Sequence, residues 1–375
     1  MNRKLAAVLA LAFLPGVAAA QQTPAPPTAR PEEDNTRFGG SSAVFLTLPA
    51  DARGAALGGS FASLVNDISS VFYNPAGLAL MGTNQAMFSY TSYIADTRHI
   101  AAALGWSLRG GEFGLGISVS NFGFSDAPVY TEEEQDGNGQ TYSVSATAVG
   151  VTGSMQFSDR FSAGITGRIV SEQLARATAT GFTVDFGTNY HAEVAGRPLR
   201  ASFVIANYGS SFQHSGPVLN SSIEPIDESM NVEDTPAQFR TSGFEPPTQF
   251  RVGVSYDVLA ASNNRLSLLS EFYQPNDADP GVGFGAEWGG TFNNGLTAAL
   301  RGSFNFAGDN RDSEVSSAFS QAAFASDDGD EGLDGLALGA GLGFRTGNFS
   351  LGVDYAYRHL GFLSSVNQFS VKLGW

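Results

Sequence analysis

The feature that most constrains this chain is a period-two alternation of apolar and polar residues, which begins near Asn84 and continues to Trp375. Successive side chains of a β-strand point to opposite faces, so this period is typical of strands with one apolar face. In the clearest stretch, Phe161 and Ile169 share one face while Arg168 takes the other. The chain is therefore predicted to be almost entirely β.

Fourteen segments carry this alternation. Each is about as long as the roughly 9 to 11 residues with which a tilted strand crosses a bilayer. The strands of a soluble sandwich would also alternate, so the pattern alone leaves that fold open. The segments are residues 84–93, 98–108, 112–122, 142–156, 160–173, 178–189, 200–208, 248–258, 264–274, 281–290, 295–305, 335–346, 348–358 and 366–375.

The lengths of the connections favour a barrel over a sandwich. Several connections after even-numbered strands are tight, such as 109–111 and 157–159, whereas residues 123–141, 209–247 and 306–334 form long acidic connections after odd-numbered strands. All long connections then lie at one end. Short periplasmic turns, long outward loops and periplasmic termini are typical of outer-membrane barrels. We predict a 14-stranded antiparallel transmembrane β-barrel of a bacterial outer membrane.

The composition agrees with a membrane barrel and excludes several classes. Charged residues make up 15% of the chain, against about 25% in soluble domains. No later segment approaches the 18 uninterrupted apolar residues of a membrane-spanning helix. The net charge of −16 argues against nucleic acid as a partner. The absence of cysteine excludes disulfides and thiolate metal sites.

The first 82 residues differ from the rest. Basic Arg3 and Lys4, an apolar stretch to Val17 and three alanines predict a secretory signal over residues 1–20. A membrane anchor is the rival interpretation, but the apolar run is short for a spanning helix. Removing Arg3 and Lys4 leaves 18 basic against 36 acidic residues, a net charge of −18. Residues 21–40 are predicted to be a disordered Pro-rich linker.

Residues 41–82 are predicted to plug the barrel formed by residues 83–375. Eight strands leave a lumen that side chains fill, and sixteen leave an aqueous channel, so fourteen would leak unless something occupied the interior. This segment mixes short helical stretches with Gly and Pro stops and ends in the motif Asn74, Pro75, Ala76 and Gly77. A plain turn, with Gly77 reversing the chain, is the simpler interpretation of that motif.

Two sequence signatures carry a resemblance to a known family. The Asn-Pro-Ala-Gly motif, preceded by Phe45-Leu-x-Leu-Pro and Ala52-Arg-Gly-Ala-Ala-Leu-Gly-Gly, resembles the PorV/PorQ family of FadL-like outer-membrane proteins. The resemblance implies a hatch within a 14-stranded barrel. It also implies either a shuttle or attachment role in type IX secretion or passage of long-chain fatty acids and other hydrophobic compounds. The final alternating strand to Trp375 resembles the signal by which barrels reach their insertion machinery.

Charged residues on the inward face are candidates for the functional site, because charge on the lipid face would cost about 2 to 4 kcal/mol near the midplane. One interpretation is an ion-pair network that holds the plug and excludes water. The other is a ligand carboxylate bound by Arg251 or Arg301. The predicted inward charges are Arg168, Asp185, Arg251, Asp257, Glu271, Glu287, Arg301, Arg345, Asp354, Arg358 and Lys372.

No pattern supports an enzyme, a metal or a cofactor. The glycine-rich runs at 281–285 and 339–343 lie within alternating strands and precede no helix, unlike nucleotide loops. Residues 327–334 lack the ligand spacing of a calcium loop, so a solvated acidic loop is expected. The four histidines do not pair at i, i+4, and a hydrolase using His99 or His359 has no recognisable serine partner.

Three functions remain open at this point. In the secretion hypothesis the long loops bind secretion-system subunits or secreted cargo proteins. In the transport hypothesis the loops gather a hydrophobic small molecule, which passes the hatch into the lumen. A barrel with a purely structural role beside outer-membrane lipid is the third. The candidate anchors in the loops are aromatic: Phe212, Phe239, Phe244, Phe319 and Phe324.

Overall fold

The computed structural model describes residues 40–223, 235–292, 294–307, 335–360 and 364–375. Among them, no helix is long and apolar enough to cross a membrane. The expected signal and linker over residues 1–40 lie almost wholly outside the described residues, as do Phe319 and Phe324 and the acidic stretch 327–334.

Fourteen strands close into one antiparallel barrel, which confirms the predicted fold class. Each strand pairs with its neighbours along the chain, β7 pairs with β12, and β1 closes the ring against β18. The predicted bounds are close to those observed. The strands are β1 (Gln85–Ser92), β2 (Arg98–Leu108), β3 (Phe113–Pro128), β4 (Thr141–Ser158), β5 (Phe161–Leu174), β6 (Ala177–Val194), β7 (Arg197–Gly209), β12 (Gln249–Ala260), β13 (Asn264–Pro275), β14 (Gly281–Thr291), β15 (Leu296–Ala307), β16 (Leu336–Thr346), β17 (Phe349–His359) and β18 (Ser365–Gly374).

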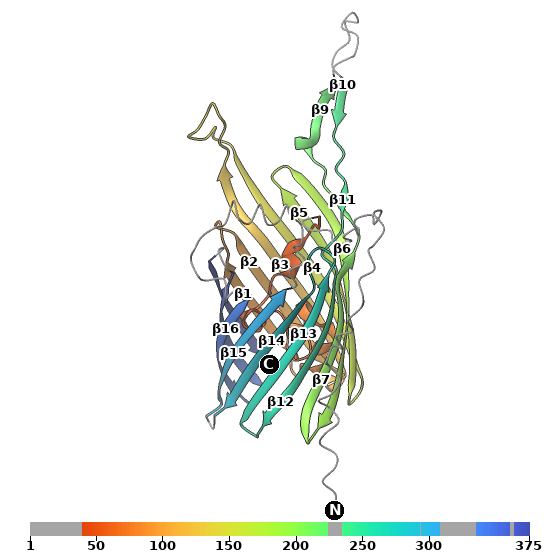
Figure 1. Ribbon diagram of the computed structural model, residues 1–375, viewed down its shortest axis with the longest axis vertical. Helices are drawn as coiled ribbons and strands as arrows, with labels where there is room; N and C mark the ends of the chain where they lie inside the picture. The colour runs from red at the N-terminus through yellow and green to blue at the C-terminus, as the bar shows by residue number, and fades with distance from the viewer. Residues whose placement is uncertain (1–39, 224–234, 293, 308–334, 361–363) are drawn as a thin grey trace, which may run out of the picture. The chain divides into compact units, whose positions relative to one another are not determined.

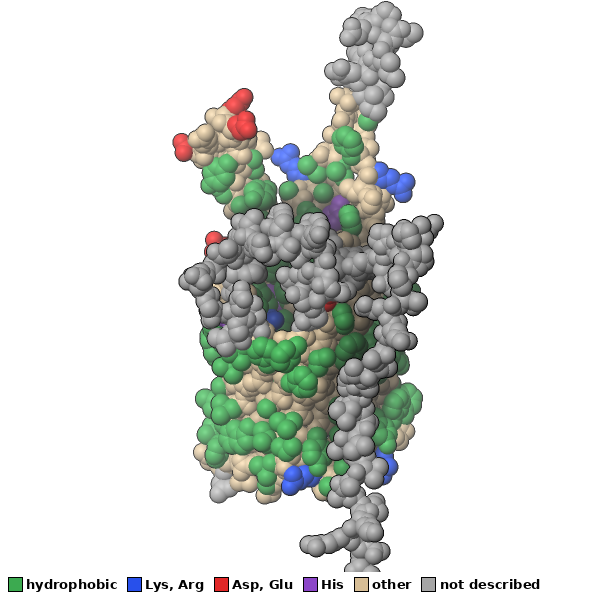
Figure 2. Space-filling model, viewed as in Figure 1, with side chains coloured by type: hydrophobic (Ala, Val, Ile, Leu, Met, Phe, Trp, Pro, Cys, Tyr) green, Lys and Arg blue, Asp and Glu red, His purple; other side chains and the backbone are tan. Residues whose placement is uncertain are grey.

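The two faces of the wall follow the period of the sequence. Ile169 is 67% exposed and Leu342 is 64% exposed, whereas Thr166 and Arg168 on the inward face are buried. Hydrophobic side chains cover much of the visible outer wall, and acidic groups gather at the tip of one projecting hairpin (Figure 2). The apolar surface is therefore outside and the polar surface inside, the reverse of a soluble barrel.

The two ends of the barrel differ, as the connection lengths predicted. We call them the long-loop end, where β3, β7 and β15 end, and the short-turn end, where tight turns such as Arg109–Gly111 lie. The loop predicted over residues 123–141 is wrong in its first part, because β3 continues to Pro128 and β4 begins at Thr141. These strands rise beyond the rim as a hairpin (Figure 1).

The long connection between β7 and β12 carries its own short elements. They are β8 (Phe212–Gln213), a 3-10 helix η4 (Pro217–Leu219), β9 (Asn220–Ile223), β10 (Thr235–Gln238) and β11 (Gly243–Phe244). β9 pairs with β10, and β8 pairs with β11. The β9–β10 hairpin projects on the same side as the β3–β4 hairpin (Figure 1).

Residues 41–81, which we call the hatch segment, pack against the inner wall from several sides. The segment contains η1 (Val44–Thr47), α1 (Ala52–Ala56), α2 (Ser70–Tyr73), η2 (Pro75–Leu80) and irregular turns between them. Its ribbon lies among the strands, in red to orange (Figure 1). α1 contacts β15 to β18, while η2 contacts β2 to β6. The hatch segment therefore bridges opposite sides of the lumen.

The hatch segment runs through the lumen from one end to the other. Ser41 forms a parallel bridge with Glu245 and the Ser42 amide donates to the Glu245 carbonyl at 3.0 Å, so the segment begins at the long-loop end. At the short-turn end, the Trp375 amide donates to the carbonyl of Asn84 at 3.0 Å. The first described residues thus do not lie at the end where both termini were predicted, whereas Trp375 does.

Candidate functional site

Inward glycines of the wall allow the hatch backbone to approach. A Cβ atom on Gly164 would lie 2.6 Å from the carbonyl of Pro75, and one on Gly283 would lie 2.2 Å from the Ser60 hydroxyl. On the opposite wall, a Cβ on Gly339 would meet the methyl group of Ala56 at 2.4 Å. One glycine of each glycine-rich run, Gly283 and Gly339, is therefore a contact point for the hatch segment.

The Asn-Pro-Ala-Gly motif fixes the second half of the hatch segment to the wall. Asn74 is fully buried and caps η2, its Oδ1 accepting from the Ala76 amide at 3.1 Å. Its Nδ2 donates to the carbonyl of Ala62 at 2.9 Å and to that of Thr188 in β6 at 3.2 Å. One side chain thus joins the cap, the first half of the hatch segment and the barrel.

The role expected for Gly77 was wrong. Gly77 lies inside η2, where a Cβ would be 2.4 Å from the carbonyl oxygen of Val65, so it permits close packing within the hatch segment. The reversal towards β1 uses Gly82, whose φ of +71° is a left-handed conformation that favours glycine.

A buried cluster of charges joins α1 to the wall near the short-turn end. The Glu287 carboxylate accepts from the guanidinium groups of Arg53 (2.8 and 2.9 Å), Arg265 (2.8 Å) and Arg301 (2.8 Å). Arg301 also pairs with Asp354 at 2.6 Å. Arg53 comes from the hatch segment and the others from the wall, so Glu287 holds the hatch by charge-assisted hydrogen bonds.

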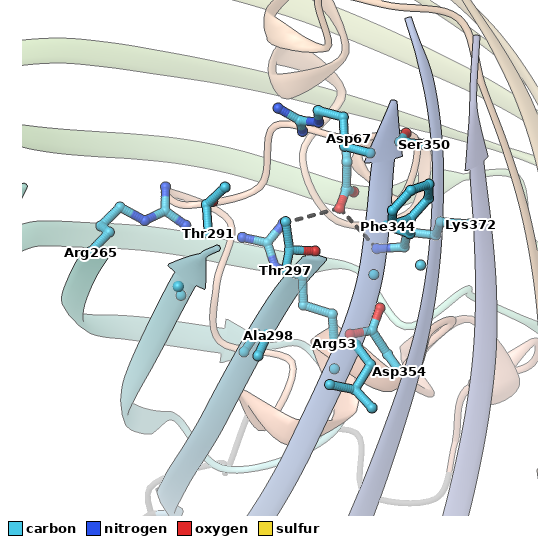
Figure 3. A pocket seen from close by; sticks show the side chains of 18 of the residues that line it. Arg53, Asp67, Arg265, Thr291, Thr297, Ala298, Phe344, Ser350, Asp354 and Lys372 are labelled. Carbon is cyan, nitrogen blue, oxygen red and sulfur yellow. Dashed lines mark hydrogen bonds and ion pairs between the residues drawn. The ribbon is translucent and has the colours of Figure 1, made fainter. Parts of the chain in front are cut away.

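Lys372 extends this cluster to β18. Its ammonium group lies 2.7 Å from Asp51 and 2.8 Å from Asp67, and Asp67 is also 3.0 Å from Arg53 (Figure 3). Burial alone would raise the pKa of the Asp67 carboxyl, but the charges of Lys372 and Arg53 outweigh burial and hold that pKa below its ordinary value. Asp67 therefore stays ionised and paired at neutral pH.

Two further wall arginines reach the hatch backbone. Arg251 donates to the carbonyl of Gly59 and, from Nε at 2.5 Å, to Glu271, whose other oxygen accepts from the Ala62 amide at 2.8 Å. Arg168 pairs with Asp185 at 2.6 Å and donates to the carbonyl of Val71 at 2.9 Å. Charge in the lumen therefore satisfies hatch backbone groups that have no strand partner.

The predicted inward charges divide into those that touch the hatch segment and those that do not. Asp257 pairs within the wall, accepting two bonds from Arg200 at 2.9 and 3.0 Å. Arg345 is exposed at the short-turn end, and Arg358 is half-buried near the long-loop end. Sequence reasoning missed Asp51, Arg53 and Asp67 of the hatch, because no period assigns a facing direction to residues in irregular segments. It also missed Arg200 and Arg265 of the wall, which lie at the ends of predicted strands and on their inward face, so the alternation could have found them.

Apolar contacts hold the hatch segment as well. Leu57, Phe61 and Leu64 pack with Leu269 of the wall, while Phe45 packs with Val170 and Phe212. Phe212 is fully buried in this cluster, so its prediction as an exposed loop anchor was wrong. Phe239 is 69% exposed and Phe244 is 40% exposed.

The hatch segment divides the lumen into cavities on its two sides. The long-loop cavity, of about 240 Å³, is lined by Leu46, Leu48, Phe72 and Tyr73 of the hatch and by Tyr273, Asn207, Gln249, Arg251, Asn305 and Arg358 of the wall. The large short-turn cavity, of about 500 Å³, surrounds the Glu287 cluster (Figure 3). The small short-turn cavity, of about 370 Å³, lies beside the β6–β7 turn.

The described residues contain no group of three or more acidic or histidine side chains that could hold a metal ion. His99 is buried in β2, and His191 lies near the end of β6. The arrangement offers binding surfaces and ion pairs.

Comparisons with known proteins agree with the barrel. The family described as Uncharacterised protein family (UPF0164) matches residues 13–171, less than half of the chain. A search of curated sequences found no match. These comparisons do not confirm the PorV/PorQ family, so that resemblance stays a prediction.

Solved structures of similar fold include three named as channels or transporters. The CymD monoaromatic hydrocarbon channel is 10% identical, with a TM-score of 0.54 over 88% of this chain and 97% of that one. The Pseudomonas putida toluene transporter TodX is 10% identical, with a TM-score of 0.53 over 87% and 98%. The Ralstonia pickettii toluene transporter TbuX is 13% identical, with a TM-score of 0.51 over 88% and 98%. At these identities the likeness shows the fold alone.

Proposed function

We propose that this chain is a non-enzymatic channel of a bacterial outer membrane, with its long loops outward, which passes small hydrophobic molecules. The observation that carries the proposal is the long-loop cavity. It lies inside a closed barrel on the long-loop side of the hatch segment, and places Leu46, Phe72 and Tyr273 among more numerous polar side chains around a space of about 240 Å³. Small-molecule sites are concave and combine apolar side chains with polar groups that orient the ligand.

The apolar outer wall and the buried charges support placement in a membrane, because lipid tolerates the first and excludes the second. The names of the structures with similar folds, hydrocarbon channels and toluene transporters, favour transport over the secretion role. For the secretion role, one of the described loop aromatics, Phe212, is unavailable because it is buried in the lumen. Transport therefore has the better support.

In this proposal the hatch segment is the barrier. The solute leaves the loops, occupies the long-loop cavity against Phe72, and continues only when the hatch segment shifts from the wall. The ion pairs around Glu287 keep the hatch seated, so the barrel does not leak polar solutes.

The test is uptake of radiolabelled toluene by cells that lack hydrocarbon channels of their own and produce this protein. Gln249 lines the long-loop cavity and its side chain is half-buried. Gln249→Trp should fill the cavity and reduce the initial uptake rate at least fivefold, whereas Gln249→Ala should leave it unchanged or faster. Equal uptake by cells with and without the protein would refute the proposal.

A further inference from the structure

The small short-turn cavity has a wall of unusual chemistry. Asn189 of β6 lines the cavity, and Ser162 of β5 and Ser202 of β7 lie beside Asn189 in register, next to the lining rather than in it. All three are at most 5% exposed. Among the described residues, neither amide atom of Asn189 nor either serine hydroxyl has a hydrogen-bond partner.

A second row lies beside the first, towards the short-turn end. His191 is in register with Arg200, and Arg200 with Ser255. The Nε2 atom of His191 and the hydroxyl of Ser255 also lack a partner among the described residues. Of these residues with unpartnered atoms, Asn189 and His191 line the cavity and the serines lie next to lining residues. Buried polar groups in proteins are nearly always hydrogen-bonded, so this cluster of exceptions at one cavity needs an explanation.

The rest of the cavity wall is largely apolar but includes Ser63 and Asn66 of the hatch segment. The hatch segment contributes Leu64, Val65 and Leu80, and the start of β7 contributes Pro198 and Leu199. A molecule in this cavity would thus meet a largely apolar surface on one side and hydrogen-bond donors and acceptors on the other.

The charge at this site is already balanced. Arg200 is the one Lys, Arg, Asp or Glu residue in the lining, and both terminal nitrogens of its guanidinium donate to Asp257, at 2.9 and 3.0 Å. An anion would find no uncompensated cation here, and a cation would meet the arginine. The chemistry favours a neutral polar group over a carboxylate.

We propose that the small short-turn cavity is a second solute site, which binds a small molecule with an apolar body and one uncharged hydrogen-bonding group, such as a phenol or an alcohol. This inference rests on the proposed function, because it places a site after the hatch segment on the solute's route. Asn189 is the specificity-determining residue, and Leu64, Leu80 and Leu199 hold the apolar body.

The test uses three fluorinated probes of similar size: 4-fluorophenol, fluorobenzene and 4-fluorobenzoate. The full-length protein, which contains no native cysteine, carries a nitroxide on Ala192→Cys at the small short-turn cavity, or on Thr47→Cys at the long-loop cavity as the matched position. Saturable broadening of the fluorine signal in nanodiscs reports occupancy beside each label.

Beside Ala192→Cys, 4-fluorophenol should bind about tenfold more tightly than fluorobenzene or 4-fluorobenzoate. Asn189→Leu, which keeps the size but removes the amide, should abolish that preference, and Gln249→Leu at the other cavity should not. If Asn189→Leu fails to fold, Asn189→Ala provides the second test and should reduce the preference severalfold.

The outcomes separate the two proposals. Equal binding of the three probes beside Ala192→Cys, a preference for 4-fluorobenzoate, or a phenol preference untouched by Asn189→Leu would overturn the inference. If fluorobenzene still binds saturably beside Thr47→Cys, the proposed function survives that failure. If no probe binds beside either label, both proposals fail.

Discussion

Glu287→Gln should loosen the hatch segment without unfolding the barrel. Within the part of the chain that the structure describes, Glu287 is the one carboxylate that accepts from three guanidinium groups, and its side chain is only 3% exposed. The substitution keeps the size of the side chain but removes the charge that ties Arg53 of α1 to the wall.

The free-energy cost of Glu287→Gln depends on the partners that each arginine retains. Removing one partner of a buried ion pair costs about 3 to 5 kcal/mol. Arg53 keeps Asp67, Arg301 keeps Asp354, and the side chain of Arg265 is 34% exposed and can be hydrated. The low end, about 3 kcal/mol, is therefore expected, which corresponds to about a hundredfold larger unseated fraction.

The assay measures how often the hatch segment leaves the wall. The chain contains no cysteine, so Ser63→Cys, at a position 1% exposed, is a unique reporter within the hatch segment. Where opening and closing are fast, the maleimide labelling rate is proportional to the open fraction. Glu287→Gln should raise that rate about a hundredfold.

The matched control is Asp257→Asn. Asp257 is as buried as Glu287 and accepts two bonds from Arg200, but both residues belong to the wall. Its loss should change the Ser63→Cys labelling rate by less than about threefold. The reasoning is refuted if Glu287→Gln changes the rate less than fivefold, or if Asp257→Asn changes it equally.

Three further outcomes are expected. Gly187→Val should raise the labelling of the same reporter at least tenfold, because a Cβ there would lie 2.1 Å from the amide oxygen of Asn74, whereas Gly167→Val, at an open position, should not; equal effects would contradict close wall contact. In intact cells a membrane-impermeant maleimide should label Val44→Cys, 49% exposed, but not Thr83→Cys at the other end; the reverse pattern would invert the orientation. Asp67→Asn should lower the thermal midpoint equally between about pH 8 and 5. The pKa of Asp67 is held below its ordinary value of about 3.9, so the difference in thermal midpoint between the wild type and Asp67→Asn should shrink only at more acid pH. If that difference already disappeared near pH 6, the result would contradict the ion pairs of Asp67.

The barrel could be predicted from the sequence because lipid and lumen impose opposite chemistry on alternate residues. The alternation correctly predicted that Arg168 points into the lumen and Ile169 towards lipid. It also predicted the strand bounds within a few residues over most of the wall. It fails where a strand leaves the bilayer. Residues 125–128 are exposed or half-buried on both faces, so β3 continues there without the alternation that would reveal it.

The site could be predicted only in part. The size of the lumen predicts a plug, and the alternation of the strands predicted Glu287, Arg301 and Lys372 on the inward face. Their partners Arg53 and Asp67 lie in short helices and turns, where burial depends on the path of the hatch segment through the lumen. Phe212 was misplaced for the same reason: its connection folds back into the mouth of the barrel, where the Phe212 ring lies against Gly181.

The most direct test of the account is to locate a bound hydrophobic solute by the anomalous signal of bromine in crystals grown with bromobenzene. The account predicts a peak inside the barrel, in the long-loop cavity between Phe72 and Tyr273, which weakens in Gln249→Trp. Bromine found only on the lipid-facing wall, with none in the lumen, would contradict it.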